Sequence, residues 1–268
     1  MEKKIIFFDV DGTLYTNELG GITDNVKKAI AATRALGHLC FVASGRPYGY
    51  IADNVKDIGF DGYVLANGAN IKYQNHDLEK RFLNYKDVKE LCQKLKEKNI
   101  EYVLQTSTVC CLDRNSQCLL DFYKKCNIDF ENFCFDYDEE EIMHKTVKIE
   151  VWVKDQEELD FAISCYGAFQ YELHPDNHSM EIYAKNVSKA TGILDVLRLL
   201  NIDIKDSYCF GDGPNDVEMF ETVGHAIAMG NAIDELKKVA SEITDTVDHD
   251  GIAKTFEKYF EIPVEEGR

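Results

Sequence analysis

Residues 5–13 read IIFFDVDGT, and this stretch decides the fold. Its first four side chains are apolar without alternation, which is typical of a short strand buried on both faces of a parallel sheet. Asp9 and Asp11 follow directly, and Gly12 allows the chain to turn. Open α/β sheets bind ligands at the carboxyl ends of their strands. Because two like charges are costly there unless a cation or a proton compensates them, the stretch predicts a catalytic site.

The sequence on both sides of a long middle region alternates between strands and helices. Apolar runs predict further buried strands at residues 39–43, 63–66, 208–210 and 226–229. Helical spacing predicts helices over residues 26–36, 48–58, 189–200, 217–222 and 252–260. This alternation favours a Rossmann-like parallel sheet with helices on both faces.

The middle of the chain, residues 82–185, is more polar, and its strands follow one another. Strands are predicted at residues 102–105, 110–112, 147–153, 169–173 and 180–183, with helices at 119–125 and 157–166. The turn-rich residues 174–179 predict a hairpin between the last two strands. The acidic residues 136–141 are expected to form a solvated loop. We therefore predict a core domain at residues 1–81 and 186–268, interrupted by an inserted α+β domain at 82–185.

Composition narrows the classes of partner. The formal net charge of −18 argues against nucleic acid and anionic membranes as partners. Nine cysteines without a Cys-x-x-Cys pair favour reduced thiols and a cytoplasmic location. The sequence shows neither a signal peptide nor an apolar run long enough to span a bilayer. Because an acidic surface repels phosphorylated molecules, any phosphate-binding site in this protein needs a cation close to the phosphate.

Polar residues follow several of the predicted core strands, and we expect them to converge at one edge of the sheet. Oxygen ligands without histidine or cysteine suit a hard cation that keeps some of its waters, which favours Mg²⁺. Lys189 lies at the start of a predicted helix, where a cation gains nothing from the helix dipole, and this favours a functional role for it. The converging residues are Asp9, Asp11, Ser44, Arg46, Lys189, Asp212, Asn215 and Asp216.

In these segments the chain resembles the haloacid dehalogenase-like hydrolases. DVDGT at 9–13, SGRP at 44–47, Lys189 and GDGPND at 211–216 match the four motifs of that family in order. The long insert between the second and third motifs resembles the cap of the Cof-type phosphatases. The resemblance covers the whole chain and implies a Rossmann-like core with a cap.

The resemblance also implies a role for each residue. Asp9 would be the nucleophile that forms an aspartyl-phosphate, and Asp11 the acid and base whose pKa is raised by its neighbours. Mg²⁺ would be held by Asp9, Asp212 and the main-chain carbonyl of Asp11, with Asp216 orienting Lys189 or a metal-bound water. Phosphate contacts are expected from Lys189 together with Ser44, Gly45, Arg46, Asn67, Gly68 and Asn215.

The leading hypothesis is a cytoplasmic, Mg²⁺-dependent phosphatase acting on a small phosphomonoester, as a monomer or weak homodimer. The resemblance implies sugar phosphates as the substrate class, with flavin mononucleotide and pyridoxal phosphate as further candidates. Two alternatives stay open. A phosphomutase or phosphotransferase would use the same intermediate, and a non-catalytic sensor would bind a phosphorylated metabolite. The sensor has no need of the proton shuttle that Asp11 would supply.

Overall fold

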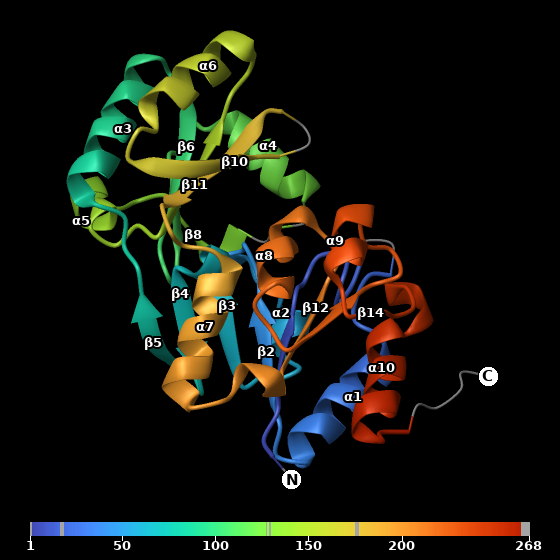
Figure 1. The fold of residues 1–268 in the computed structure, drawn as a ribbon. Coiled ribbons are helices and arrows are strands. Elements are labelled where there is room, and N and C mark those ends of the chain that lie inside the picture. The colour runs from blue at the N-terminus through green and yellow to red at the C-terminus, as the bar shows by residue number, and fades with distance from the viewer. Residues whose placement is uncertain (1, 17–18, 127, 129, 175–176, 264–268) are drawn as a thin grey trace. The chain divides into compact units, whose positions relative to one another are not determined.

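A computed structural model describes residues 2–16, 19–126, 128, 130–174 and 177–263. The chain divides into two compact units, each with its own sheet (Figure 1). The core unit comprises Met1–Gly45, Asp53–Leu78 and Ser188–Arg268, and the cap unit Arg46–Ala52 and Glu79–Val187. This division differs from the predicted boundaries by a few residues at each junction, and it groups the short segment Arg46–Ala52 with the cap unit.

The core unit is built on a sheet of order β14-β13-β12-β1-β2-β3-β4-β5. From β14 to β3 the neighbouring strands are parallel, whereas β4 runs antiparallel to β3. The central strand β1 lies between β12 and β2, with Phe7 opposite Cys209 and Phe41. The strands are β1 (Ile5–Phe8), β2 (Leu39–Ala43), β3 (Gly62–Leu65), β4 (Asn70–Tyr73), β5 (His76–Lys80), β12 (Ser207–Gly211), β13 (His225–Ala228) and β14 (Glu242–Ile243).

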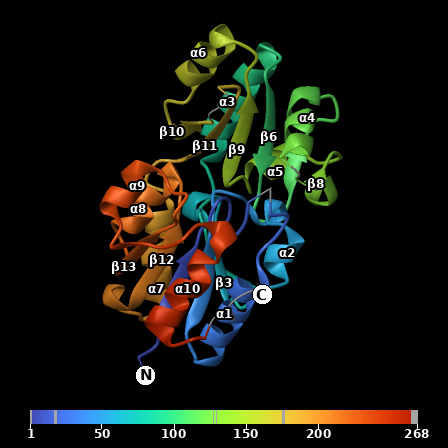
Figure 2. The ribbon, with the colours of Figure 1, turned by 90° about the vertical axis from the view of Figure 1, so that its right-hand side faces the viewer.

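Helices cover both faces of this sheet, as predicted (Figure 2). On one face α7 (Lys189–Leu200), α8 (Val217–Phe220) and α9 (Asp234–Val239) pack over an apolar cluster that includes Phe7 and Phe41. On the other, α1 (Asp24–Ala35) and α10 (Gly251–Phe260) pack together, and Phe256 contacts Phe8 and Phe210. Two buried faces explain why β1 carries four consecutive apolar side chains.

The predicted helix over residues 48–58 is wrong in part, because it is not continuous. The chain forms a 3₁₀ turn at Tyr48–Tyr50 and a short helix α2 (Asp53–Lys56), with Ile51 extended between them. The ring of Tyr50 packs against Tyr123 and Phe133 of the cap unit. We attribute the break to this aromatic packing, because tertiary contacts readily override a weak local preference for helix.

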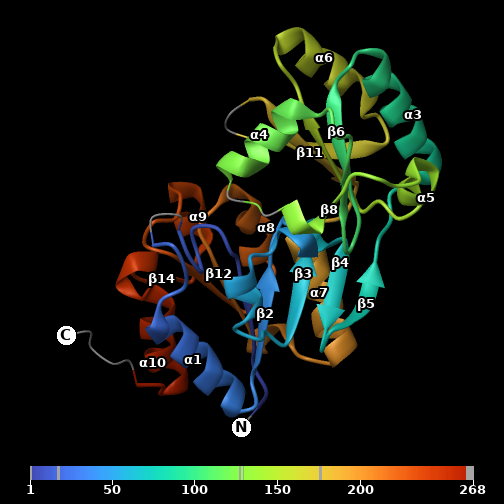
Figure 3. The same ribbon diagram turned by 180° about the vertical axis from the view of Figure 1, so that it is seen from behind.

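The cap unit has a six-stranded sheet of order β10-β11-β9-β6-β7-β8. Figure 3 labels β6, β8 and β11 of this sheet. Its neighbouring strands are antiparallel except for β7 and β8. The strands β10 and β11 form the predicted hairpin, of whose link Pro175 and Asp176 lie outside the described residues. The strands are β6 (Glu101–Gln105), β7 (Cys110–Leu112), β8 (Phe133–Cys134), β9 (Lys148–Trp152), β10 (Phe169–Leu173) and β11 (Ser179–Ala184).

Helices also flank the cap sheet. Helices α3 (Tyr85–Glu97) and α6 (Gln156–Cys165) cover one face, while α4 (Gln117–Lys125) packs near Tyr50 on another apolar cluster. The expected acidic loop is wrong in part, because its last residues begin α5 (Glu139–Met143). Asp138 caps that helix, and three glutamates in its first turn are favoured by the helix dipole. Among the described residues, no helix is both long and apolar enough to cross a membrane.

Candidate active site

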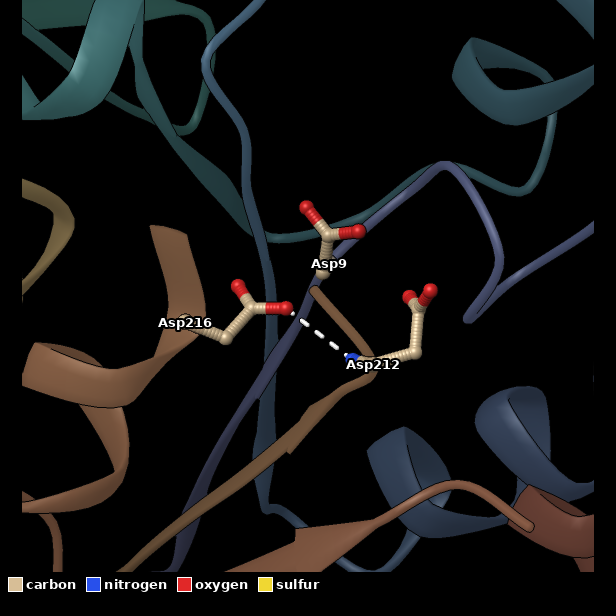
Figure 4. A group of neighbouring side chains, drawn as sticks. All are labelled: Asp9, Asp212 and Asp216. Atoms are coloured by element: carbon tan, nitrogen blue, oxygen red, sulfur yellow. Dashed lines mark hydrogen bonds between the residues drawn. The ribbon is translucent and has the colours of Figure 1, made fainter. Parts of the chain in front are cut away.

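Carboxylates from distant parts of the sequence meet at one edge of the core sheet. Asp9 follows β1 and Asp212 follows the neighbouring parallel strand β12, whose Phe210 lies opposite Phe8. Asp216 stands in the 3₁₀ turn that comes next. Carboxylate oxygens of Asp9, Asp212 and Asp216 all lie within 4.8 Å of one another (Figure 4). Parallel pairing of β1 with β12 thus creates the acidic cluster that the sequence predicted.

Lys189 lies inside this cluster with a side chain only 1% exposed. Its Nζ donates to Asp9 Oδ1 at 2.6 Å and to Asp216 Oδ1 at 2.7 Å. Helix α7 begins at this lysine because the hydroxyl of Ser188 accepts from the backbone N–H of Thr191, forming a capping box. A Cβ on Gly68 would lie 2.2 Å from the carbonyl oxygen of Ser188, so glycine allows α7 to approach the sheet closely.

Asp216 holds the cluster together through both of its carboxylate oxygens. Oδ1 accepts from Lys189, and Oδ2 accepts from the backbone N–H groups of Asp212 and Gly213, each at 3.0 Å. The residue is fully buried. Asp216 therefore orients Lys189 and the Asp212 loop at the same time.

The turn after β1 is fitted to Asp212. The hydroxyl of Thr13 donates to Asp212 Oδ1 at 2.7 Å. Gly12 has a φ of +84°, and a Cβ at this position would lie 2.2 Å from Asp212 Oδ2. Only glycine satisfies both the left-handed backbone and the close approach.

The cluster holds three carboxylates and one ammonium, and burial dominates its electrostatics. Burial raises the pKa of Asp9, an effect that Lys189 opposes and the other carboxylates reinforce. Burial likewise raises the pKa of Asp212 to about 6, although the hydrogen bond from Thr13 counteracts it. Burial lowers the pKa of Lys189, but Asp216 and Asp9 outweigh it and hold the pKa above its usual range. The site is therefore short of positive charge.

The donor set fits a hard divalent cation. Within the described part of the chain, Oδ2 of Asp9 and Oδ2 of Asp212 accept no hydrogen bond, whereas Oδ1 of each residue does. Two carboxylate oxygens beside a site that lacks positive charge are suited to Mg²⁺, which also keeps water ligands. Asp9 and Asp212 could thus hold the metal, whereas both oxygens of Asp216 already accept hydrogen bonds.

The predicted phosphate-contacting residues include a compact group after β2 and β3. Ser44 is 2% exposed, and its carbonyl oxygen accepts from the N–H of Asn67 at 3.3 Å. A Cβ on Gly45 would lie 2.9 Å from Asn67 Oδ1. Ser44, Gly45, Asn67 and Gly68 thus belong to adjoining loops of the core unit, and Gly68 borders the first turn of α7.

The remaining predicted residues have more open positions. Asp11 is exposed, and its backbone forms an isolated bridge with Tyr15. Asn215 is exposed in the turn before Asp216. Arg46 falls in the cap unit, where its Nη1 donates to the carbonyl oxygen of Tyr50 at 3.0 Å.

Comparison with known proteins identifies the family. The profile of the haloacid dehalogenase-like hydrolases matches residues 6–256. The chain is 32% identical to a Bacillus subtilis protein named "Putative phosphatase YkrA", an alignment that covers 94% of this chain and 96% of that one. It is 27% identical to the 5-amino-6-(5-phospho-D-ribitylamino)uracil phosphatase YcsE of Bacillus subtilis, covering 94% and 93%. The solved structure of the subclass IIB sugar phosphatase BT4131 superposes with a TM-score of 0.80 at 25% identity, covering 97% and 100%.

The chain belongs to the haloacid dehalogenase-like hydrolases. Within that family it is a phosphatase, which agrees with the names of these two relatives and of this structural neighbour.

Two contributions to the site escaped the sequence analysis. The sequence places Thr13 only in a motif and does not predict its hydrogen bond to Asp212. A hydroxyl directly after an Asp-x-Asp-Gly turn is a feature that could indicate such a contact with a carboxylate. Asn231 follows β13 and donates to the carbonyl oxygen of Gly12 at 2.7 Å. Nothing in its neighbourhood in the sequence indicates that contact, which spans 219 positions.

Proposed function

We propose that the protein is a Mg²⁺-dependent phosphatase that hydrolyses a small phosphomonoester, of the sugar phosphate class, through an aspartyl-phosphate on Asp9. The supporting observation is the contact of Lys189 Nζ with Asp9 Oδ1 at 2.6 Å inside a buried acidic cluster. An ammonium fixed there favours the ionised form of Asp9 against the effect of burial, and it lies where phosphoryl oxygens would need positive charge. A purely structural ion pair would not need the additional carboxylate of Asp212.

In the proposed mechanism, Asp9 attacks phosphorus and the ester oxygen leaves as an alcohol. Asp11 gives that oxygen a proton, and then takes a proton from the water that cleaves the aspartyl-phosphate. Lys189, the hydroxyl of Ser44 and nearby backbone N–H groups hold the phosphoryl oxygens. Asp216 keeps Lys189 in place.

Asp9, Asp212 and the main-chain carbonyl of Asp11 would hold Mg²⁺. When bound, the metal would neutralise the carboxylates and stabilise negative charge on the phosphoryl group. We further propose a cytoplasmic location, supported by nine free thiols, and a monomer or weak homodimer in solution.

The decisive experiment measures release of inorganic phosphate from a panel of phosphorylated metabolites, with Mg²⁺ and with a chelator. The panel includes hexose and pentose phosphates, flavin mononucleotide, pyridoxal phosphate and the phosphoribitylaminouracil on which the relative YcsE is named to act. We expect turnover of at least one member, only with Mg²⁺. Absence of turnover across the panel would count against the proposal.

A phosphotransferase with the same intermediate is distinguished by isotope-labelled water. Hydrolysis requires that label from the solvent enters the released phosphate, because water cleaves the aspartyl-phosphate. Transfer to a second hydroxyl instead yields a new phosphomonoester without the label.

A further inference from the structure

The segment after β13 connects the two loops that form the acidic cluster. The N–H of Met229 donates to Gly211 O, and the N–H of Ile233 donates to Asp212 O, both at 3.0 Å. Between them, Asn231 Nδ2 donates to Gly12 O at 2.7 Å. The segment therefore contacts the end of β12 through its backbone and the turn after β1 through one side chain.

The side chain of Asn231 is held at both ends. While Nδ2 donates to Gly12 O, Oδ1 accepts from the backbone N–H of Val247 at 3.4 Å. A carbonyl on one side and an N–H on the other leave only one orientation of the amide that satisfies both bonds. An amide held in this way fixes the position of the turn at Gly12 relative to the segment at Val247.

The carbonyl that Asn231 holds belongs to the peptide between Gly12 and Thr13, so only Gly12 separates it from Asp11. Gly12 is fixed at its other end as well, because its N–H donates to Tyr15 O at 2.9 Å. Its left-handed backbone sets the direction in which the chain leaves Asp11. Rotation of the Gly12–Thr13 peptide would move Thr13, which donates to Asp212, and through Gly12 it would also move Asp11.

We infer that Asn231 is a positioning residue for the reaction, which orients Asp11 through the Gly12 carbonyl. This inference rests on the proposed function, in which Asp11 protonates the leaving alcohol. Losing Asn231 should therefore slow the reaction most where that proton is needed most. Small displacements of a catalytic group reduce rates substantially.

The test compares two leaving groups. An alkyl phosphate needs protonation of its leaving oxygen, whereas p-nitrophenyl phosphate departs as a stable anion without it. We expect Asn231→Ala to lower kcat/KM, which reports formation of the aspartyl-phosphate and not its hydrolysis, roughly tenfold for the alkyl ester and less than about threefold for p-nitrophenyl phosphate. Asn231→Asp keeps the size of the side chain but loses the Nδ2 donor, and it should show the same selective loss. This variant replaces Asn231→Ala in the test if the alanine variant folds poorly.

Lys237→Ala is the matched control. Lys237 Nζ donates to Gly230 O at 2.7 Å, so this variant loosens the same segment without touching Gly12. We expect its kcat/KM to stay within about twofold of wild type on both esters. Equal losses of Asn231→Ala on both esters, or a selective loss in Lys237→Ala as well, would overturn the inference.

Asp11→Asn separates this result from failure of the proposed function. It should show the same preference for p-nitrophenyl phosphate, more strongly. If Asp11→Asn lowers kcat/KM equally for both esters, Asp11 is not the acid, and the inference falls together with that part of the mechanism. A selective loss in Asp11→Asn but not in Asn231→Ala overturns the positioning role alone.

Discussion

Each unit of the molecule buries a lysine beside carboxylates, and the two clusters differ in how completely they are neutralised. In the core unit, Lys189 faces Asp9 and Asp216, with Asp212 beside them. In the cap unit, Lys148 is also 1% exposed and is paired with Glu181 at 2.5 Å. Both lysines are inaccessible to water, so their partners decide what each cluster can do.

The carboxylates of the cap cluster accept more side-chain hydrogen bonds per residue, although burial raises the pKa of Glu150 there as well. Glu150 accepts from the hydroxyl of Tyr123 at 2.6 Å and from Gln105 Nε2 at 3.1 Å. Burial lowers the pKa of His174, but the carboxylates of Glu181, 3.7 Å from Nε2, and of Glu150 together outweigh this and raise it. Hydrogen bonds to Glu150 and a proton held by His174 thus stabilise negative charge that Lys148 alone would not neutralise.

The core cluster differs because, among the described residues, Oδ2 of Asp9 and Oδ2 of Asp212 accept no hydrogen bond, and burial raises the pKa of both carboxyls. The comparison teaches that burial of charge does not by itself mark a functional site. The informative feature is negative charge that the protein leaves uncompensated.

The largest effect is expected from Asp9→Asn. Loss of the nucleophile should lower phosphatase turnover at least about 1,000-fold, while circular dichroism and the thermal midpoint stay near wild type. Asp136→Asn, in an exposed part of the cap unit, is the control and should keep full activity. Substantial residual activity in Asp9→Asn would remove Asp9 from the role of nucleophile.

The two buried lysines should respond differently to substitution by methionine. Lys148→Met removes the buried ammonium beside Glu181, and the free energy of unfolding should fall by about 3 kcal/mol, with or without Mg²⁺. Lys189→Met should also destabilise, but Mg²⁺ should restore part of its loss, because the metal replaces the missing positive charge.

Denaturant unfolding with and without Mg²⁺ checks this difference. The double variant Lys148→Met/Glu181→Leu is the matched control and should recover most of the lost stability. If Mg²⁺ stabilises both single variants equally, the two clusters are not distinct in the way we describe.

Without Mg²⁺, the stability of the folded protein should fall as the pH rises, and with Mg²⁺ this fall should be smaller or absent. The folded pKa of Asp212 is about 6, above its ordinary value of 3.8, so the folded state binds this proton more tightly than the unfolded state does. Its stabilising effect is complete below about pH 4 and is lost as the pH rises through 6. The raised pKa of Asp9 extends this loss to higher pH.

Mg²⁺ should remove this loss, because it binds the deprotonated carboxylates. The increase in thermal midpoint caused by Mg²⁺ should therefore be larger at pH 8 than at pH 5. Asp212→Asn should reduce that difference. A metal effect independent of pH would contradict the assignment of Asp9 and Asp212 as ligands.

The smallest effect is expected from Thr13→Val. Removing the hydroxyl leaves Asp212 Oδ1 without its hydrogen bond, a change of about 1 kcal/mol. The Mg²⁺ concentration for half-maximal activity should rise several-fold, because the pKa of Asp212 rises and its orientation loosens. Thr13→Ser keeps the hydroxyl and should behave like wild type. An unchanged Mg²⁺ requirement in Thr13→Val would show that this hydrogen bond does not tune the site.

The core could be predicted from the sequence because its signals are local. The uninterrupted apolar run before Asp9 has the length and composition of a strand buried on both faces, and the structure forms β1 there. Strand ends then position Asp9 and Asp212 automatically, since β1 and β12 are parallel neighbours. The capped start of α7 brings in Lys189.

Other features were hidden because their causes are not local. The segment around Tyr50 is broken by aromatic side chains more than 70 positions further along the chain. The polar cluster of the cap unit uses alternate residues of β9, Lys148 and Glu150, which as a sequence resemble an ordinary solvated strand face. Helix α3 was not singled out at all, although Asn84 caps it.

The place of β1 in the sheet has a consequence for synthesis of the protein. One of its edges pairs with β2, which follows within about 40 residues, but the other must await β12, near residue 207. On the ribosome, the strand that carries Asp9 is thus translated early and stays unpaired along one side until the whole cap unit has been made. An open apolar edge of this kind invites pairing with other chains, so the slowest step of folding and the greatest risk of aggregation should coincide with the arrival of β12.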